Sequence, residues 1–515
     1  MKTLVSYGKF PYSLWFVMLF FRCVDLVWIQ SSYVPDEYWQ SLEVAHNKVF
    51  GYGYLTWEWT EGIRSYIYVT LISGLYYLLK FFDMDTAEAI ITSPRILQGI
   101  ISSIADVYFI RWVHEKRNGQ YSWAFISWVT CYFISYCSTR TLLNTFEMNL
   151  TTIALYYYPW SPKANNLTFV LIVTLLVFAR PTAAIVWLPF VLINIVSMRK
   201  PLNYFLTTYL PIGLLVSGIC IALDSWMHGS IVITPWNFFK FNVLKDVGSH
   251  YGAHPSLWYF YAGIPAILGV HTFTFYYGFL KTIYNRLSKY QHDVEAQMSV
   301  CILWTLLVYS FLPHKEFRFL MPLLPMMIYI SSGIFSRWSV TASSALIYIV
   351  GTIMILTNMI SVLYLGQFHQ VGTLETMSNL RETIKNDTNI KIVFLAPCHS
   401  FPGYSHLHAN ITTRYLSCLP NLENESDYQD ETERFYNNTA QWLNIEYTTL
   451  YPCTLPSHLV FFNSLKIPKF LSVKNYTLHK EIFNNLHYSQ PREGESIYIY
   501  RRKEIMAIIN QKTCC

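Results

Sequence analysis

Long apolar runs recur along the first 366 residues of this 515-residue chain, and they limit what it can fold into. A helix that crosses a membrane needs about 20 mostly apolar residues. Runs of this kind occur near residues 11–30, 66–82, 95–113, 121–137, 148–160, 168–198, 204–224, 257–280, 297–313, 319–338 and 342–366. The sequence therefore predicts a polytopic α-helical membrane protein with roughly ten spans.

The composition supports the same class. Charged residues make up 13% of the chain, whereas soluble domains carry about 25%. Aromatic residues make up 17%, which is typical of a protein with aromatic belts at the membrane surfaces. The net charge of +6 is not gathered into a basic stripe, so we expect no nucleic-acid partner.

Short basic loops indicate the orientation of the spans. Residues 114–117 and 198–200 are rich in Lys and Arg and are expected to be cytosolic. The run 11–30 has no small-residue cleavage site and is interpreted as a retained anchor. The count of spans between residues 66 and 113 has the wrong parity, so one run there is expected to be re-entrant or not to cross fully.

The polar tail after residue 366 is predicted to be a separate lumenal domain, with a transmembrane module at 1–366 and the tail at 367–515. Glycosylation sequons point to the lumen and occur in the tail at Asn386, Asn410, Asn424, Asn437 and Asn475, with two more at Asn149 and Asn166. Short apolar runs at 391–396, 459–462 and 496–500 predict strands. We therefore expect a small α/β fold.

An acidic loop follows the first apolar run, at about residues 31–65. It contains Asp36 and Glu37 directly after Pro35. Carboxylates are costly to hold beside a membrane, so a functional role is one interpretation of this pair. Neighbouring residues on a helix point about 100° apart, so one carboxylate is expected to face a cleft and the other to brace the loop. Ordinary capping of a solvated helix remains the alternative, because Pro followed by acidic residues is typical of a first turn.

A basic cluster lies between the last apolar runs. His314, Lys315 and Arg318 surround Glu316, a combination that suits a phosphate group. The alternative is an anchor whose long side chains reach the membrane surface. Arg180-Pro181 interrupts the run 168–198, which indicates either a broken helix beside a binding cavity or a structural kink.

The sequence offers little support for a metal site. Cys398, His399, His406 and His408 lie close together in the tail, but their spacing is irregular and no carboxylate completes a ligand set. No Cys-x-x-Cys pair occurs. We therefore expect no metal and no cofactor.

Several short polar motifs carry a resemblance to a known family. They are Asp36-Glu37, Thr56-Trp57-Glu58-Trp59 with Arg64-Ser65, Arg140-Thr141, Arg180-Pro181-Thr182 and above all His314-Lys315-Glu316-Phe317-Arg318-Phe319. Together they resemble glycosyltransferase family 22, in patches from about residue 31 to 408. The strings 34–43, 53–59, 397–400 and 404–408 are similar to the members that act on the glycosylphosphatidylinositol (GPI) anchor precursor.

The resemblance implies a GT-C fold in the endoplasmic reticulum membrane, with the active site and the tail in the lumen. It implies transfer of the third mannose in α1,2 linkage from dolichyl phosphate mannose to the dimannosyl GPI precursor. The position that matches the family's catalytic base is Asp36, with Glu37 beside it. His314, Lys315 and Arg318 are then expected to hold the donor phosphate. Weaker candidates for substrate contacts are Trp57, Glu58, Arg64, Arg140 and Arg180.

Two alternatives stay open at this stage. One is a sister α1,2-mannosyltransferase of the same family that extends the lipid-linked N-glycan precursor. The other is a polytopic lipid transporter or scramblase, a class that tends to show paired halves with broken helices at corresponding positions. The sequence does not show such symmetry. It also leaves the oligomeric state undecided.

Overall fold

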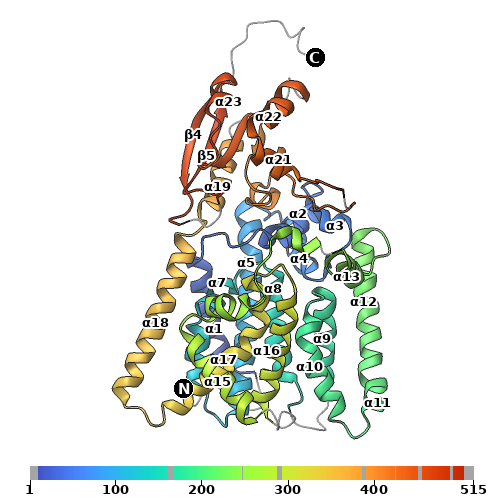
Figure 1. Cartoon of the computed structure of the whole chain (residues 1–515), viewed down its shortest axis with the longest axis vertical. Helices are drawn as coiled ribbons and strands as arrows, with labels where there is room; N and C mark the ends of the chain where they lie inside the picture. Colours follow the sequence, from blue (N-terminus) through green and yellow to red (C-terminus); the bar gives the residue numbers. More distant parts are fainter. Residues whose placement is uncertain are drawn as a thin grey trace. The chain divides into compact units, whose positions relative to one another are not determined.

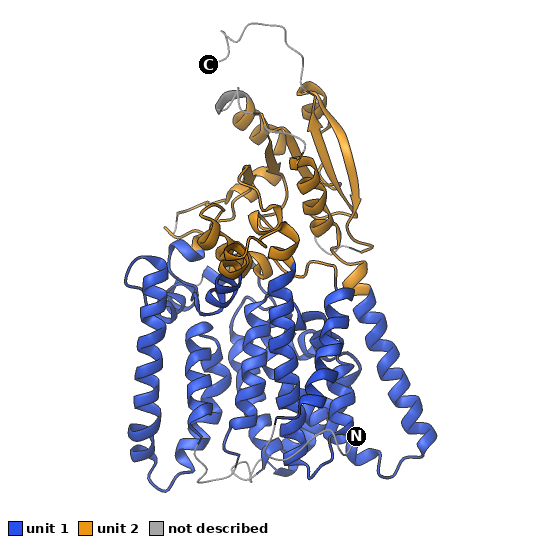
Figure 2. Cartoon of the chain, turned by 180° about the vertical axis from the view of Figure 1, so that it is seen from behind, with its two compact units in different colours: residues 1–29, 58–75, 92–363 blue, residues 30–57, 76–91, 364–515 orange. Residues whose placement is uncertain are grey.

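The computed structural model describes residues 10–160, 166–245, 247–286, 293–385, 390–423, 425–450, 455–487 and 491–503. The chain divides into two compact units, coloured separately in Figure 2. The first unit comprises residues 1–29, 58–75 and 92–363, and the second comprises 30–57, 76–91 and 364–515. Residues 31–57 of the acidic loop therefore belong to the same unit as the tail, and residues 58–65 belong to the first unit.

The first unit is a bundle of apolar helices (Figure 1). Its principal helices are α1 (Tyr12–Trp28), α4 (Ile67–Phe81), α5 (Ala87–Lys116), α6 (Ser122–Val129), α7 (Tyr132–Ser138), α8 (Leu143–Tyr157), α9 (Leu167–Ala179), α10 (Ala183–Val196), α11 (Pro201–Tyr204), α12 (Leu210–His228), α13 (Thr234–Phe239), α14 (Ile264–Leu268), α15 (Thr272–Arg286), α16 (Val294–Phe311), α17 (Leu324–Trp338) and α18 (Ser344–Gln367). A 3₁₀ segment, η8 (Phe317–Leu323), leads into α17.

Five helical segments of the described chain are long and apolar enough to cross a membrane. They are Ala87–Lys116, Pro201–His228, Val294–Phe311, Phe317–Trp338 and Ser344–Lys385. Shorter apolar helices cover 67–81, 167–179 and 183–196. This is a multi-pass membrane protein.

The expected break at Arg180-Pro181 is confirmed, since α9 ends at Ala179 and α10 begins at Ala183. The prediction of continuous helices over 121–137 and 257–280 was wrong. The first range breaks at Cys131, whose backbone is extended, and the second breaks at Gly269, which has φ +53° and ends α14.

A buried ionic network ties α1 to three other helices. Arg22 Nε donates to Asp106 of α5 at 2.7 Å, and its Nη1 donates to Asp25 at 2.6 Å. Trp128 of α6 donates to Asp106, and Ser138 of α7 donates to Asp25. Buried charges are tolerated in an apolar bundle only when they are paired in this way, so the network fixes how these helices pack.

The second unit is built on a five-stranded mixed sheet in the order β2-β1-β3-β5-β4. The strands are β1 (Lys391–Phe394), β2 (Thr412–Tyr415), β3 (His458–Phe462), β4 (Tyr476–Phe483) and β5 (Ser496–Arg502). Strand β1 runs parallel to β2 and β3, whereas β5 runs antiparallel to β3 and β4. The three strands predicted from apolar runs are confirmed as β1, β3 and β5.

Both faces of the sheet are covered, which explains why its central strands are apolar throughout. Ile392 and Phe394 point to the face that packs on Met377 of helix α19 (Gly372–Lys385). Val393 lies in the core of the other face. That face is covered by α21 (Glu431–Asn437), α22 (Thr439–Asn444) and α23 (Pro468–Val473), seen beside the strands in Figure 1.

Candidate active site

The acidic loop begins a helix at Asp36. Backbone amides of Glu37, Tyr38 and Trp39 donate to the carbonyls of Val34 and Pro35, which forms the first turn. The helix continues as a π-helical segment, η1 (Tyr38–Leu42), and then as α2 (Glu43–Phe50). Short π-helical segments are rare and often occur at functional sites. Asp36 is half-buried, whereas Glu37 is only 3% exposed.

His399 of the tail lies near Asp36. Burial lowers the pKa of His399 to about 4, and the charge of Asp36 partly offsets this effect. His399 also lies against Trp39, with ring centroids 4.9 Å apart. The indole of Trp39 donates to the Phe401 carbonyl at 3.1 Å. The tail segment that follows β1 therefore lines the helix that carries Asp36.

Glu43 fastens this helix to the tail. Its carboxylate accepts hydrogen bonds from the backbone amide of Gly403 at 2.8 Å and from the amide of Ser405 at 3.2 Å. The Ser405 hydroxyl donates to it as well. Glu43 is 1% exposed. A buried carboxylate with several donors is held in one geometry, so Glu43 is a fixed point between residues far apart in the sequence.

One turn further along, His46 Nε2 and His408 Nδ1 lie 3.1 Å apart. Burial and the neighbouring His408 lower the pKa of His46 to about 3, so the pair is neutral at ordinary pH. Residues 404–407 form the short helix α20, which packs on α2. Residues 39–46 of the acidic loop are thus bound to the segment that follows β1.

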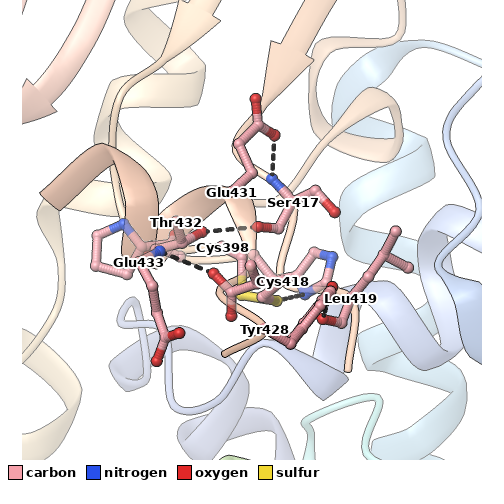
Figure 3. Close-up of a disulfide and its surroundings, with 12 residues drawn as sticks. Cys398, Ser417, Cys418, Leu419, Tyr428, Glu431, Thr432 and Glu433 are labelled. Carbon is pink, nitrogen blue, oxygen red and sulfur yellow. Dashed lines mark hydrogen bonds between the residues drawn. A yellow bond between two sulfur atoms is a disulfide. The ribbon is translucent and has the colours of Figure 1, made fainter. Parts of the chain in front are cut away.

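A disulfide stabilises this tail segment. Cys398 and Cys418 are bonded to each other, and Cys418 Sγ lies 3.8 Å from His399 Nδ1 (Figure 3). Ser417, next to Cys418, donates its amide to Glu431 and accepts from Thr432. Cys398, His399 and Cys418 also form the one group of three ligand-type residues that the described chain brings together. Both sulfurs are used by the disulfide, which leaves no thiolate there for a metal.

The basic cluster lies in the first unit, between α16 and η8. The Glu316 carboxylate accepts from His314 Nε2 at 3.0 Å and from Arg318 Nε at 2.6 Å. Burial opposes ionisation of Glu316, but the Arg318 guanidinium and the hydrogen bonds from His314 and Arg318 hold its pKa well below the usual range. Arg318 is therefore oriented by a charged partner on its own loop.

Lys315 is placed differently from its two neighbours. Its ammonium donates to the carbonyls of His254 and Leu312, and the residue is 3% exposed. Burial lowers the pKa of its ammonium. These bonds hold the loop 252–258 against the loop 312–315, and Trp258 stacks on Phe317 at 4.8 Å. His314 Nδ1 lies 3.3 Å from the Gly252 carbonyl of the same loop, so Lys315 and His314 both hold these two loops together.

Arg180 approaches the basic cluster from the break between α9 and α10. Its Nη1 forms a 2.7 Å ion pair with Glu147 of α8. The ring of Phe319 lies 5.5 Å from the Arg180 guanidinium and 5.7 Å from that of Arg318. Asn144 of α8 donates to the Arg318 carbonyl at 3.1 Å. Two guanidiniums thus converge on one aromatic ring, each balanced by its own carboxylate.

The weaker sequence candidates lie in three places. Glu58 and Arg64 form an ion pair at 2.5 Å, and His228 of α12 contacts the Arg64 carbonyl. Arg140 is buried after α7, where Nε donates to the Tyr136 carbonyl at 2.9 Å. Trp57 is half-buried at the start of the short helix α3 (Trp57–Thr60).

The candidate residues divide between the two units. Asp36, Glu37 and Trp57 belong to the second unit. The rest belong to the first, and they are Glu58, Arg64, Arg140, Arg180, His314, Lys315 and Arg318. Within the first unit the structure gathers Arg180 with Arg318, and Glu58 with Arg64. The roles of all these residues remain predictions.

The sequence interpretation missed three carboxylates that orient the site. Glu43 and Glu316 stand within the quoted motifs but received no role, and Glu147 stands alone in an apolar helix. An isolated acid inside an apolar run is costly, so Glu147 carried a usable signal. Asn149 of the same helix is 1% exposed and donates to Ser102 at 2.8 Å. Its sequon is therefore not open to a glycan, contrary to its use as a lumenal marker.

Two solved structures that resemble this fold are those of ArnT from Cupriavidus metallidurans. The crystal structure of ArnT from Cupriavidus metallidurans bound to undecaprenyl phosphate aligns with a TM-score of 0.59, covering 96% of this chain and 98% of that chain at 9% identity. The apo structure of ArnT gives a TM-score of 0.57. The architecture is thus that of a GT-C membrane glycosyltransferase, as predicted.

Residues 13–408 match the Alg9-like mannosyltransferase family, and the chain belongs to that family. The resemblance seen in the short motifs is therefore confirmed. A Drosophila melanogaster protein named GPI mannosyltransferase 3 is 41% identical, covering 90% of this chain and 82% of that protein. Proteins named GPI alpha-1,2-mannosyltransferase 3 are 39% identical in Bos taurus and 38% identical in Homo sapiens. These cover 95% and 94% of this chain, and 89% and 85% of those proteins.

Proposed function

We propose that this protein transfers the third mannose, in α1,2 linkage, from dolichyl phosphate mannose to the dimannosyl GPI-anchor precursor. The observation that carries the proposal is the identity of 38–41%, over at least nine-tenths of the chain, to animal proteins named for this transfer. The family membership supplies the class of enzyme. The donor and acceptor are both lipids, which suits a multi-pass membrane protein.

The proposed location is the endoplasmic reticulum membrane, with the tail and the active site in the lumen. Asn410, Asn437 and Asn475 are exposed sequon residues of the second unit. The Cys398–Cys418 disulfide lies in the same unit, and disulfides persist in oxidising compartments. Both features support a lumenal second unit, and that unit includes residues 31–57 of the acidic loop.

The proposed reaction is a direct displacement. The mannose of the donor is β-linked and that of the product is α-linked, so the anomeric carbon inverts. The 2-hydroxyl oxygen of the acceptor mannose bonds to that carbon as its bond to the phosphate oxygen breaks. Dolichyl phosphate leaves with the bonding electron pair, and the hydroxyl proton passes to a base. We assign the base to Asp36.

The half-buried position of Asp36 suits this role better than that of Glu37. A base must reach the acceptor hydroxyl, and Asp36 retains exposed surface, whereas Glu37 is almost fully enclosed. Glu43 and the tail segment hold the helix that begins at Asp36. A base that is held in place needs little reorganisation when the reaction occurs.

The leaving phosphate needs positive charge rather than an acid. Arg318 and His314 are the proposed phosphate contacts, with Lys315 a weaker one because its ammonium already binds two carbonyls. Arg180 adds a second guanidinium beside Phe319. Glu316 and Glu147 orient the two arginines, so their donors are preorganised for an anion. We expect the chemistry to need no metal or other cofactor.

The experiment is a transfer assay on membranes that contain the full-length protein. Radiolabelled dolichyl phosphate mannose is supplied with the dimannosyl GPI precursor in one reaction and with the lipid-linked N-glycan precursor in another. We expect label in a trimannosyl GPI lipid that an α1,2-specific mannosidase releases. Label only in the N-glycan precursor would assign the protein to the sister activity, and no label in either would reject the proposal.

A further inference from the structure

A charged cavity of about 390 Å³ lies in the first unit, away from the basic cluster. It is formed where α5, α15, α16 and α17 come together, and Figure 1 shows the last three as neighbours. Its charged lining residues are the bases Lys116, Arg117, Arg286 and Arg337 and the acids Asp293 and Glu295. Four cations against two carboxylates leave a net charge of two positive units. A cavity with this surplus favours an anion.

Glu295 organises the arginines of this cavity. Its Oε2 is 3.0 Å from Arg286 Nη1, and its Oε1 is 3.2 Å from Arg337 Nη1. Within the described residues, the ion pairs of both arginines use Nη1, and a guanidinium has five N–H donors. The side chains of Arg286 and Arg337 are 41% and 46% exposed. They can therefore donate to a further anion while Glu295 keeps them in place.

The guanidinium of Arg117 is held in the wall of the cavity by specific contacts. Its guanidinium lies 4.0 Å from the centre of the Tyr329 ring and donates to Ser332 Oγ at 3.0 Å. A Cβ at Gly333 would come within 2.5 Å of Arg117 Nη2. A side chain at position 333 would therefore displace the Arg117 guanidinium from its present contacts. The charged side chains of the cavity are therefore held in place by specific contacts, unlike lysines and arginines scattered on a surface.

The cavity is at the opposite end of the helices from the candidate donor site. Helix α16 starts at the cavity and ends just before His314, and its 18 residues span about 27 Å. Helix α17 runs back, from just after Arg318 to Arg337 near its end. The hydrocarbon core of a membrane is about 30 Å thick. The cavity therefore lies at the membrane surface away from His314 and Arg318, and its ligand cannot be the donor phosphate bound there.

We propose that this cavity binds the phosphate of an anionic phospholipid headgroup from the leaflet facing that surface. Arginine forks match phosphate oxygens, and basic pockets between spanning helices are typical sites for such headgroups. A free phosphate ion shares the recognised group, so the test separates the two sources. The inference does not depend on which sugar the enzyme transfers.

The test uses the full-length protein in phosphatidylcholine nanodiscs. Phosphatidic acid is added as the lipid probe and inorganic phosphate as the soluble probe, and binding is followed by native mass spectrometry and by the rise in Tm. The variant is R286Q/R337Q. The control is R199Q/K200Q, which removes the same charge from exposed residues between α10 and α11. We expect the first variant to weaken phosphatidic acid binding by about ten-fold or more, and the control to change it less than two-fold.

Each outcome decides the proposal. Saturable binding of phosphatidic acid that is lost in R286Q/R337Q but kept in R199Q/K200Q supports a lipid site. Binding of inorganic phosphate without binding of phosphatidic acid would assign the site to the free ion and would overturn the lipid proposal. Equal losses in both variants would indicate general attraction of anions and would overturn it. If R286Q/R337Q fails to fold, the measurements on the wild type still decide the question. A wild-type protein that binds neither probe and shows no rise in Tm would mean that the arginines form a structural network only.

Discussion

The carboxylate of Glu43 accepts hydrogen bonds from both the backbone amide and the hydroxyl of Ser405, a residue 362 positions further along the chain. Glu43 follows Asp36 by less than two helical turns, and Ser405 follows strand β1. The helix that carries Asp36 and the tail are therefore one structural unit. The position of Asp36 depends on this attachment.

Substitutions at this attachment should destabilise the second unit. We expect Ser405→Ala to lower the free energy of unfolding by about 1.5–3 kcal/mol, because the bond to a buried carboxylate is lost. Ser400→Ala is the matched control in the same segment, since its hydroxyl donates to the neutral Pro397 carbonyl at 2.7 Å. Its cost should be about 1 kcal/mol or less. Thermal unfolding of the purified protein measures both, and equal costs would contradict a special role for Glu43.

The disulfide should stabilise the same segment. Cys398→Ser with Cys418→Ser is expected to cost about 2–4 kcal/mol, since the cross-link restrains the unfolded chain. Reductant should lower the Tm of the wild type and leave that of the double variant unchanged. Cys23→Ser, at an exposed free cysteine of α1, is the control and should respond to reductant like the wild type. Reductant sensitivity that persists in the double variant would place the labile bond elsewhere.

Acid should weaken the second unit through His399. Its pKa is lowered from 6.5 to about 4 in the folded state, first by burial. Between those values the unfolded state binds a proton that the folded state does not, so stability falls as the pH falls from 6.5 toward 4 and is unaffected above 6.5. His399 contributes roughly 1.4 kcal/mol per pH unit at most to the slope. His46, whose pKa is lowered to about 3, adds to the same slope. His399→Gln should reduce the slope, whereas His479→Gln on the exposed edge of β4 should leave it unchanged.

Transfer should not require a divalent metal. The one group of three ligand-type residues in the described chain has its two sulfurs in a disulfide. We expect membranes treated with a chelator to retain at least about half of their transfer rate. Activity lost in chelator and restored by manganese would contradict this prediction and would require metal ligands that neither the sequence analysis nor the structure identified.

The sequence predicted the sheet only in part, for a physical reason. Strands β1, β3 and β5 are central and covered, so they appear as apolar runs. Strands β2 and β4 lie at the two edges, and most of the side chains of β4 are exposed. Such edge strands lack an apolar pattern and went unpredicted. Pairing with the neighbouring strand, rather than local sequence, determines them.

The candidate site was predictable to a similar extent. The motifs around Asp36 and Arg318 were recognisable because polar residues interrupt apolar runs. The contact of Glu43 with Ser405, and the disulfide between Cys398 and Cys418, join residues that no local pattern relates. The ion pair of Arg180 with Glu147 likewise depends on how α8 packs beside the break between α9 and α10. These partners follow from packing and not from spacing.

The basic cluster allows a test of donor binding. Arg318→Ala should raise the KM for dolichyl phosphate mannose by about ten-fold, because the guanidinium is assigned to the phosphate. Arg111→Ala removes another buried guanidinium, one that lies 4.9 Å from the centre of the Tyr156 ring, and is the control for lost packing. A lower Tm with an unchanged KM in Arg318→Ala would show that the residue only anchors the loop.

The most direct test of the account compares Asp36→Asn with Glu37→Gln in the transfer assay with dolichyl phosphate mannose and the dimannosyl acceptor. Both changes remove one carboxylate from the same turn of helix, and both proteins are first checked for wild-type Tm. We predict that Asp36→Asn lowers kcat by about a hundred-fold or more while Glu37→Gln keeps most of the activity. Wild-type transfer by a folded Asp36→Asn protein would contradict the assignment of the catalytic base.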